Sequence, residues 1–214
     1  MSILRLSNIS KSYSERTVLK EFSLDVDRGE IVAITGESGS GKSTLLNIIG
    51  LLESPNEGEL EICNIKNPKI NSAHSKNILR YKLSYLFQNY GLIENESVMT
   101  NLLIACRFIK ESRKGKKEVM KKALKDVELS VNLDEKVYKL SGGEQQRLAL
   151  AKLLIKPSEI ILADEPTGSL DSKNRDIVLY NLNKLNKLGK TIVIVTHDSV
   201  VSSFAHRSIE LIRN

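Results

Sequence analysis

Apolar residues follow two alternating patterns along this chain. Short runs rich in β-branched residues predict buried strands, and these runs cover 30–35, 83–87, 160–163 and 191–195. Between the runs, apolar residues recur at every third or fourth position, which predicts helices over 45–52, 76–81 and 171–188. Strands that alternate with helices in this way indicate an α/β fold with a mostly parallel central sheet.

Further strands are expected nearer the N-terminus, at 3–9, 18–26 and 59–65. The first two are separated by a polar, turn-rich connection at 10–14, and the third follows a turn at 54–58. We expect these strands to form an N-terminal antiparallel β subdomain.

From 97 to about 140 the apolar spacing is helical throughout. One apolar stripe consists of Val98, Leu102, Leu103, Ala105 and Cys106. A second stripe consists of Val119, Met120, Ala123, Leu124 and Val127. A helical block that interrupts an α/β chain indicates an inserted helical subdomain at about 90–155, with the core formed by 1–89 and 156–214. The 214 residues then make up a single domain.

The net charge of +6 has a local origin. The segment 107–126 contains nine basic residues and three acidic ones, an excess of six, so the rest of the chain is neutral on balance. The basic residues are Arg107, Lys110, Arg113, Lys114, Lys116, Lys117, Lys121, Lys122 and Lys125. A uniformly basic nucleic-acid binder would not have this distribution, so we expect no nucleic-acid partner. The segment is either a solvated helix face, which we favour, or a binding surface.

The cysteine content indicates a reducing compartment, and the hydropathy of the chain indicates no membrane span. The two cysteines, Cys63 and Cys106, are too few for a disulfide framework and lack metal-ligand spacing. The first residues form no long apolar signal region, and no stretch approaches the ~18 apolar residues of a membrane span. We therefore expect a cytoplasmic protein, which could serve a membrane only through a partner that crosses it.

A glycine-rich loop lies between the strand at 30–35 and the helix that follows it. Its residues match the pattern G-x-x-x-x-G-K-[ST] and are Gly36, Glu37, Ser38, Gly39, Ser40, Gly41, Lys42, Ser43 and Thr44. The backbone N–H groups of such a loop and the helix N-terminus suit a polyphosphate, while Lys42 would reach its terminal phosphates and Ser43 would ligate Mg²⁺. The alternative is a glycine-rich turn with a chance lysine. Kinases, GTPases and motor proteins share this P-loop, so the loop alone does not identify the protein class.

Two adjacent carboxylates, Asp164 and Glu165, follow the buried strand at 160–163. Open α/β sheets bind ligands at the carboxyl ends of their strands. There Asp164 can hold Mg²⁺, and Glu165 can orient and deprotonate an attacking water. His197 follows the strand at 191–195 at the same sheet edge, where it is a candidate contact for a γ-phosphate.

Two further features admit more than one interpretation. Ser141 and Glu144 have capping-box spacing, but the intervening Gly142 and Gly143 lower helix stability in a first turn and indicate a backbone that approaches a ligand closely. Tyr13 is either a surface tyrosine or an aromatic that stacks on a purine base.

Taken in order, these motifs resemble the ATPase subunits of ABC transporters over nearly the whole chain, from 3 to 213. The resemblance rests on the P-loop, Gln88 after a strand, the run Leu140-Ser141-Gly142-Gly143-Glu144-Gln145-Gln146, the pair Asp164-Glu165, Ser169-Leu170-Asp171, and His197. It implies a P-loop NTPase core with ATP and Mg²⁺ as ligands, and a permease subunit that holds the chain at the inner face of the plasma membrane.

The resemblance also implies a head-to-tail, nucleotide-dependent homodimer. Each ATP would lie between one P-loop and the residues Ser141, Gly142, Gly143 and Gln145 of the second copy. Tyr13 corresponds to the aromatic that stacks on adenine. Gln88 corresponds to the residue that contacts Mg²⁺, the attacking water and the membrane partner.

Within that family, the segment 164–171 is similar to the branch that serves lipoprotein release, macrolide efflux and antimicrobial-peptide export or resistance. The segment 87–95 is similar to a small group named as bacteriocin exporters. Many relatives have a proline soon after the glutamine, where this chain has Glu94-Asn95-Glu96. The leading hypothesis is an ATPase that powers export or release of a peptide, bacteriocin or amphipathic compound through a separate permease. The alternatives are a signalling ATPase of the cell-division type and a soluble ABC protein that acts on ribosomes or DNA.

Overall fold

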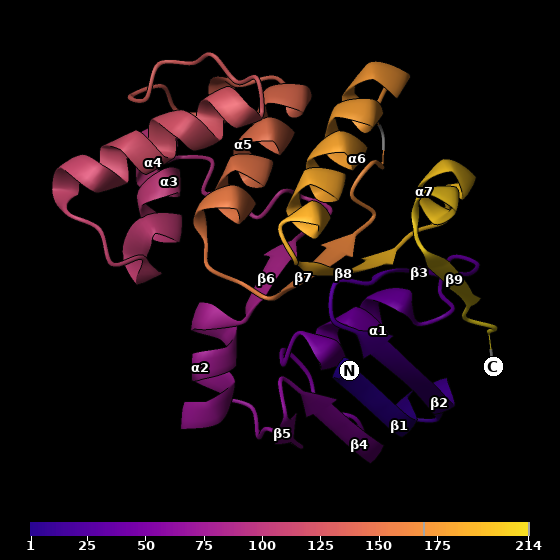
Figure 1. The fold of residues 1–214 in the computed structure, drawn as a ribbon. Helices are drawn as coiled ribbons and strands as arrows, with labels where there is room; N and C mark the ends of the chain where they lie inside the picture. Colours follow the sequence, from indigo (N-terminus) through magenta and orange to yellow (C-terminus); the bar gives the residue numbers. More distant parts are fainter. Residues whose placement is uncertain (169, 214) are drawn as a thin grey trace.

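The computed structural model describes residues 1–168 and 170–213, which contain two β-sheets with helices packed around them (Figure 1). The larger sheet has the strand order β6-β7-β8-β3-β9, and its neighbouring strands are parallel. Its strands are β3 (Ile31–Thr35), β6 (Leu83–Leu86), β7 (Ile160–Asp164), β8 (Thr191–Val195) and β9 (Arg207–Glu210). The predicted α/β fold with a parallel central sheet is confirmed.

The smaller sheet is antiparallel and has the order β2-β1-β4-β5, which confirms the expected N-terminal β subdomain. Its strands are β1 (Ser2–Tyr13), β2 (Arg16–Asp27), β4 (Glu57–Ile62) and β5 (Ile65–Lys66). The predicted turn at 10–14 is too long, because β1 stays paired with β2 as far as Tyr13 and the chain turns only at Ser14 and Glu15. The predicted strand at 59–65 is interrupted by a turn at Cys63 and Asn64, which both have positive φ.

The helices are α1 (Lys42–Ile49), α2 (Ala73–Tyr81), α3 (Val98–Ala105), α4 (Arg113–Asp126), α5 (Gly142–Ile155), α6 (Ser172–Lys187) and α7 (Ser199–Phe204), with short 3₁₀ turns at Cys106–Phe108 and Val137–Lys139. Side chains cap several of them at the N-terminus: Ser97, Ser112, Ser141 and Asp171 each accept a hydrogen bond from the backbone N–H three residues later. No helix in the described ranges has the length and apolar character needed to cross a membrane.

The central sheet is covered on both faces. In β7, Ile160 and Leu162 pack with α1 and the antiparallel sheet, whereas Ile161 and Ala163 pack with the core of α3 to α6. Figure 1 shows the two layers, with α1 and the antiparallel sheet below the central sheet and α3 to α6 above it. Because side chains alternate along a strand, a strand buried on both faces must be apolar at every position, as β7 is from Ile160 to Ala163.

The helical block differs from its prediction in two segments. The chain is not helical at 109–112, between the two stripes. It is also not helical at 127–136, where Glu128 takes a positive φ of 55° after α4 ends. Here the N–H groups of Val98 and Met99 bond to the carbonyls of Glu135 and Leu133, so long-range pairing replaces the helix. Both predicted stripes are otherwise buried or half-buried, except that the side chain of Leu103 is exposed.

The side chain of Asn101 connects the start of the helical block to the loop that follows Gln88 through hydrogen bonds. The side chain is fully buried, and its Oδ1 accepts a hydrogen bond from Ile93 N–H at 2.9 Å. Its Nδ2 donates to the carbonyls of Ile93 and Ser97, each at 3.1 Å. One buried amide side chain therefore finds all of its hydrogen-bond partners in the backbone of Ile93 and Ser97.

We expect Asn101→Ala to lower the free energy of unfolding by about 2 kcal/mol or more, because it removes the three hydrogen bonds of a fully buried amide and leaves the Ile93 N–H without its partner. Denaturant titration monitored by circular dichroism measures this change. Asn77→Ala on the exposed face of α2 is the control and should change the value by less than ~0.5 kcal/mol. Equal effects of the two substitutions would show that the Asn101 hydrogen bonds contribute nothing specific.

Candidate nucleotide site

The loop at 36–41 connects β3 to α1 in a conformation that requires glycine. Gly36 and Gly41 have φ values of 148° and 101°. A Cβ on Gly36 would lie 2.5 Å from the carbonyl oxygen of Leu211, and one on Gly41 would lie 2.8 Å from Cγ1 of Val18. Gly41 is the N-cap of α1 and supplies no side-chain cap, so the first N–H groups of α1 are available to an anion.

Lys42 lies inside the curve of this loop. Its Nζ donates to the carbonyls of Gly36 at 2.7 Å and Glu37 at 2.8 Å, and the side chain is buried. These bonds hold an ammonium group among backbone N–H groups, where its charge adds to the positive end of the α1 dipole. The arrangement suits a ligand with several negative charges.

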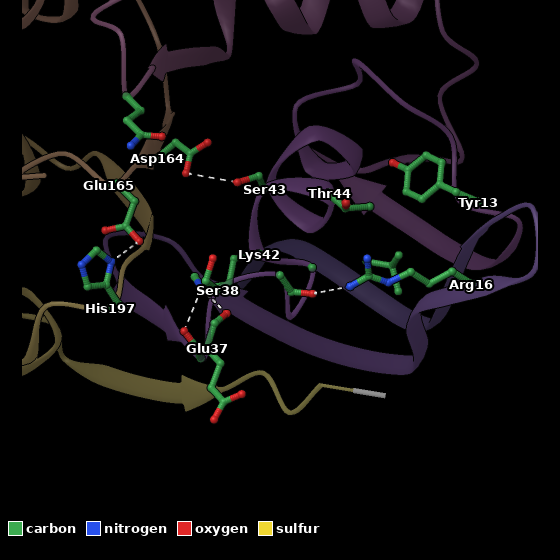
Figure 2. Close-up of a pocket in the computed structure, with 15 residues that line it drawn as sticks. Tyr13, Arg16, Glu37, Ser38, Lys42, Ser43, Thr44, Asp164, Glu165 and His197 are labelled. Atoms are coloured by element: carbon green, nitrogen blue, oxygen red, sulfur yellow. Dashed lines mark hydrogen bonds and ion pairs between the residues drawn. The ribbon is translucent and has the colours of Figure 1, made fainter.

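The loop borders a cavity of about 760 Å³, large enough for a nucleotide (Figure 2). Its lining comprises Tyr13, Arg16, Val18, Gly36, Glu37, Ser38, Gly39, Gly41, Lys42, Ser43, Thr44, Gln88, Asp164, Glu165 and His197. Of the predicted P-loop residues, Ser40 is absent from this lining, because its side chain is buried beneath the loop. The carboxyl ends of β3, β6, β7 and β8 supply most of the other groups, as expected for a parallel sheet.

The two carboxylates have different surroundings. Asp164 Oδ1 lies 3.5 Å from Ser43 Oγ. Glu165 accepts a hydrogen bond from Thr196 Oγ1 at 3.1 Å, and its other oxygen lies 2.7 Å from Nδ1 of His197, as Figure 2 shows. Glu165 also has a positive φ of 44°, a backbone conformation that costs free energy in a residue with a Cβ.

Burial raises the pKa of Asp164 above its ordinary value, and the negative charge of Glu165 raises it further. A hydrogen bond from Ser43 and the charge of Lys42 act in the opposite direction. Holding two carboxylates together at this edge therefore costs the folded protein stability, and a cation or cationic group at the site would relieve that cost.

Tyr13 forms the far side of the cavity, at the end of β1 rather than on a loop. Its hydroxyl donates to Glu53 at 2.6 Å, and Lys11 forms an ion pair with the same carboxylate at 3.0 Å. The ring remains half exposed toward the cavity, where Arg16 also lies with its Nη2 3.5 Å from the carbonyl of Gly39. The sequence did not identify Arg16 or Glu53, because neither belongs to a spaced motif.

The predicted contacts at the start of α5 lie outside this cavity. Ser141, Gly142, Gly143 and Gln145 are absent from its lining. Ser141 and Glu144 form the predicted capping box: Ser141 Oγ accepts from Glu144 N–H, and the Glu144 carboxylate accepts from Ser141 N–H at 2.8 Å. Ser141 and Gly142 are exposed, and Gln145 donates to the carbonyl of Leu140 at 3.0 Å.

Polar contacts that the sequence did not predict connect α5 to the carboxylate loop. The buried Gln146 donates through Nε2 to the carbonyl of Pro166, directly after Glu165. Arg147 Nη1 donates to Asn174 Oδ1 at 2.9 Å, and Asn174 N–H donates to Asp171, the N-cap of α6, at 2.8 Å. Gln146 and Asp171 belong to runs that carry the family resemblance, but their spacing does not reveal these contacts. Arg147 and Asn174 belong to no motif. Ser169 in the predicted run Ser169-Leu170-Asp171 lies outside the described residues.

We expect Asp164→Asn to stabilise the ligand-free protein at neutral pH, because the amide removes a buried charge and can still accept from Ser43. A carboxyl group with a raised pKa in the folded state stabilises at low pH, and this contribution is lost as pH rises through that pKa. The gain from Asp164→Asn should therefore shrink as the pH falls. Thermal unfolding at several pH values measures it, with the exposed Asp134→Asn as control. A loss of stability at neutral pH would contradict the electrostatic explanation.

Comparisons with known proteins agree with this geometry. The family model described as ABC transporter matches residues 19–168. A macrolide export ATP-binding/permease protein, MacB, of Campylobacter jejuni is 43% identical over 206 residues, which are 96% of this chain but 32% of that protein. The chain therefore spans about a third of that relative's length. The ABC transporter ATP-binding protein MJ0796 of Methanocaldococcus jannaschii is 41% identical, with 98% of this chain and 93% of that protein covered.

Solved structures show the same likeness. The dimeric structure of MJ0796, a bacterial ABC transporter cassette, superposes with a TM-score of 0.89 at 40% identity, covering 98% of this chain and 94% of the other. A dimeric post-hydrolysis state of MJ0796 bound to ADP and Pi gives a TM-score of 0.88 at 40% identity, over 97% of this chain and 94% of the other. With its P-loop, its paired carboxylates at one sheet edge and these relatives, the chain belongs to the ABC transporter family and is an ATP-hydrolysing cassette.

Proposed function

We propose that two copies of this chain close head to tail on ATP and that the closed dimer drives a membrane permease. The observation that carries the proposal is the separation of two sets of groups in one chain. The P-loop, Asp164 and Glu165 line the cavity, whereas Ser141 and Gly142 are exposed outside it. A second copy can bring its own α5 N-terminus to the phosphates, where N–H groups and the helix dipole favour anions.

The cavity fits a divalent cation beside the phosphates. Ser43 Oγ and Asp164 Oδ1 are oxygen donors 3.5 Å apart, and Gln88 reaches the same cavity from the end of β6. Mg²⁺ prefers hard oxygen ligands and usually shares them with substrate phosphates, so these residues suit it. When bound, Mg²⁺ would neutralise charge on the phosphate oxygens.

Glu165 is the group that we assign as general base. Its carboxylate is held by Thr196 and His197, so the side chain is fixed in one orientation at the cavity wall. A fixed carboxylate can orient a water and accept its proton as the water oxygen bonds to the γ-phosphorus. The bond between that phosphorus and the β–γ bridging oxygen breaks in the same reaction, and ADP leaves. His197 is exposed beside Glu165 and would contact the γ-phosphate, while Tyr13 would stack on adenine.

The helical subdomain, which we assign to about 90–155, offers a surface for the permease. Leu103 and Ile104 on α3 are 46% and 44% exposed, and Tyr81 at the end of α2 is 44% exposed. Tyr81 packs edge-on against Phe108 with ring centroids 5.7 Å apart, so apolar side chains from the end of α2 and from the 3₁₀ turn after α3 lie together. An exposed apolar patch of this kind is typical of a protein interface.

Export through such a permease is the role that we favour for this chain. The macrolide export relatives are named as ATP-binding/permease proteins. We propose the corresponding pairing here, at the inner face of the plasma membrane, with a peptide, bacteriocin or amphipathic compound as cargo. The permease that co-purifies with the chain, and the compounds whose export depends on it, test this assignment.

Glu165→Gln tests the closed dimer. Glutamine keeps the size of glutamate and its capacity to hydrogen-bond but cannot accept the proton, so turnover should fall by ~10² to 10⁴. ATP binding should remain, because Lys42, Ser43 and the loop amides are intact. Light scattering should then show a monomer without nucleotide and a stable dimer with ATP.

Lys42→Ala is the matched counterpart. It removes the ammonium group that lies within the loop, so both ATP binding and ATP-dependent dimerisation should be lost. If Glu165→Gln turned over ATP at nearly the wild-type rate, or lost ATP binding as Lys42→Ala should, Glu165 would not be the general base. A stable dimer of the wild type in nucleotide-free buffer would contradict the nucleotide dependence.

A further inference from the structure

Helix α4 and the segment before it carry a dense set of exposed basic side chains, which we call the basic face. Its members are Arg107, Lys110, Arg113, Lys114, Lys117, Lys121, Lys122 and Lys125. The opposite side of α4 is anchored in the core by Met120, Ala123 and Leu124. Most of the basic face is therefore presented on a fixed helix, not on a loose loop.

The fold leaves this charge largely uncompensated. In the part of the chain that the structure describes, only one member of the basic face, Lys121, forms an ion pair. Its Nζ lies 3.4 Å from Oε1 of Glu118. Asp126, at the end of α4, pairs instead with Lys184 on α6 at 3.1 Å. The acidic residues of the segment thus neutralise little of its positive charge.

The same charge is unfavourable for the helix itself. The first turn of α4 contains Arg113 and Lys114 and no acidic residue, although the helix dipole favours negative charge there. Lys117, Lys121 and Lys125 are spaced four residues apart, so like charges are neighbours on one face. Basic residues at positions where they weaken the helix point to a partner outside the chain.

The surroundings of the basic face indicate the kind of partner. The connection from α3 to α4 and the first turns of α4 project to the side of the molecule where α2 and α3 lie (Figure 1). On that side Arg107 and Lys110 are close in sequence to the exposed Leu103 and Ile104. Aliphatic and aromatic side chains beside lysines and arginines are typical of surfaces that meet the headgroup region of a membrane.

We propose that the basic face binds the anionic headgroups of the membrane that holds the permease, alongside the apolar patch of α2 and α3. This inference rests on the proposed function for its location at a membrane. Most members are lysines, which act as mobile point charges and suit a diffuse anionic layer, whereas bidentate recognition of a single phosphate favours arginine. Each basic residue near such a surface contributes about 1 kcal/mol, or roughly fivefold in binding.

The test uses the full chain and lipid vesicles without nucleotide. Flotation should recover the chain with vesicles that contain phosphatidylglycerol but not with vesicles of phosphatidylcholine alone, and added salt should weaken the binding. The variant carries Lys114→Gln, Lys117→Gln, Lys122→Gln and Lys125→Gln, which keep helix propensity. Because each substitution should weaken binding roughly fivefold, the four together should weaken it by roughly 600-fold.

The control variant changes the same number of exposed basic residues on other surfaces: Lys20→Gln, Lys66→Gln, Lys69→Gln and Arg213→Gln. It has the same net charge as the first variant and should bind within about threefold of wild type, since basic residues remote from the basic face contribute little. Basal ATP hydrolysis by both variants should stay within a few-fold of wild type, because neither set touches the cavity. Circular dichroism confirms that both are folded.

Equal loss in both variants, or no preference for phosphatidylglycerol, would overturn the proposal. Displacement from the vesicles by equimolar single-stranded RNA would also overturn it in favour of a nucleic-acid partner. Because flotation uses neither ATP nor the permease, a negative result with normal ATP-dependent dimerisation would reject the lipid contact alone. Failure of ATP-dependent dimerisation in the wild type would instead reject the proposed function.

Discussion

The parallel alignment of β3, β7 and β8 is the constraint on which the rest of this structure depends. Asp164 pairs in register with Val195, and Ile34 pairs with the same residue from the other side. The strands therefore end together, and the loops that follow them converge on one edge. Each of these strands is apolar on both faces. If one strand shifted by one residue against its neighbour, apolar side chains would still be buried, so burial alone does not fix the register. The helices and loops that leave the strand ends must contribute to the register.

The loop after β7 connects the chemistry to the rest of the fold. Glu165 N–H donates to the carbonyl of Val195 at 2.9 Å, and its own carbonyl accepts from Gly168 N–H at 3.0 Å. These bonds hold the positive φ of Glu165 and orient its carboxylate toward the cavity. Gln146 on α5 donates a hydrogen bond to Pro166 in the same loop. A partner that binds at the start of α5 could therefore shift the position of the Glu165 carboxylate through this one hydrogen bond.

Much of the fold and most of the cavity could be predicted because their signals are local. Apolar β-branched runs and the P-loop spacing depend on neighbouring residues, and strand ends follow from them. The polar residues of 10–14 favour a turn, but pairing with β2 and a hydrogen bond from Ser12 N–H to the Asn56 side chain keep that segment extended. Strand β9 has no local signal, because its mostly exposed residues form a strand only by pairing with β3. Thr196, Gln146 and Asn174 act through contacts that are distant in sequence, so no local pattern reveals them.

In the proposed dimer, one chain holds half of each ATP site and a second copy completes it. Complementation between two defective chains tests this claim, both in a Glu165→Gln background so that ATP is not consumed. One chain carries Lys42→Ala, and the other carries Ser141→Asp, which preserves an N-cap residue but places a negative charge where the phosphates would lie. In a mixed dimer, the P-loop of the Ser141→Asp chain meets the unchanged α5 of the Lys42→Ala chain, so one ATP site is intact. The other site contains both substitutions.

Light scattering and bound-nucleotide analysis of the two chains, alone and mixed, provide the decisive measurement. Each chain alone should remain monomeric with ATP, and the mixture should form a dimer that retains one ATP. If the Ser141→Asp chain alone formed an ATP-bound dimer, or if the mixture remained monomeric, the ATP site would not be shared between two copies of this chain.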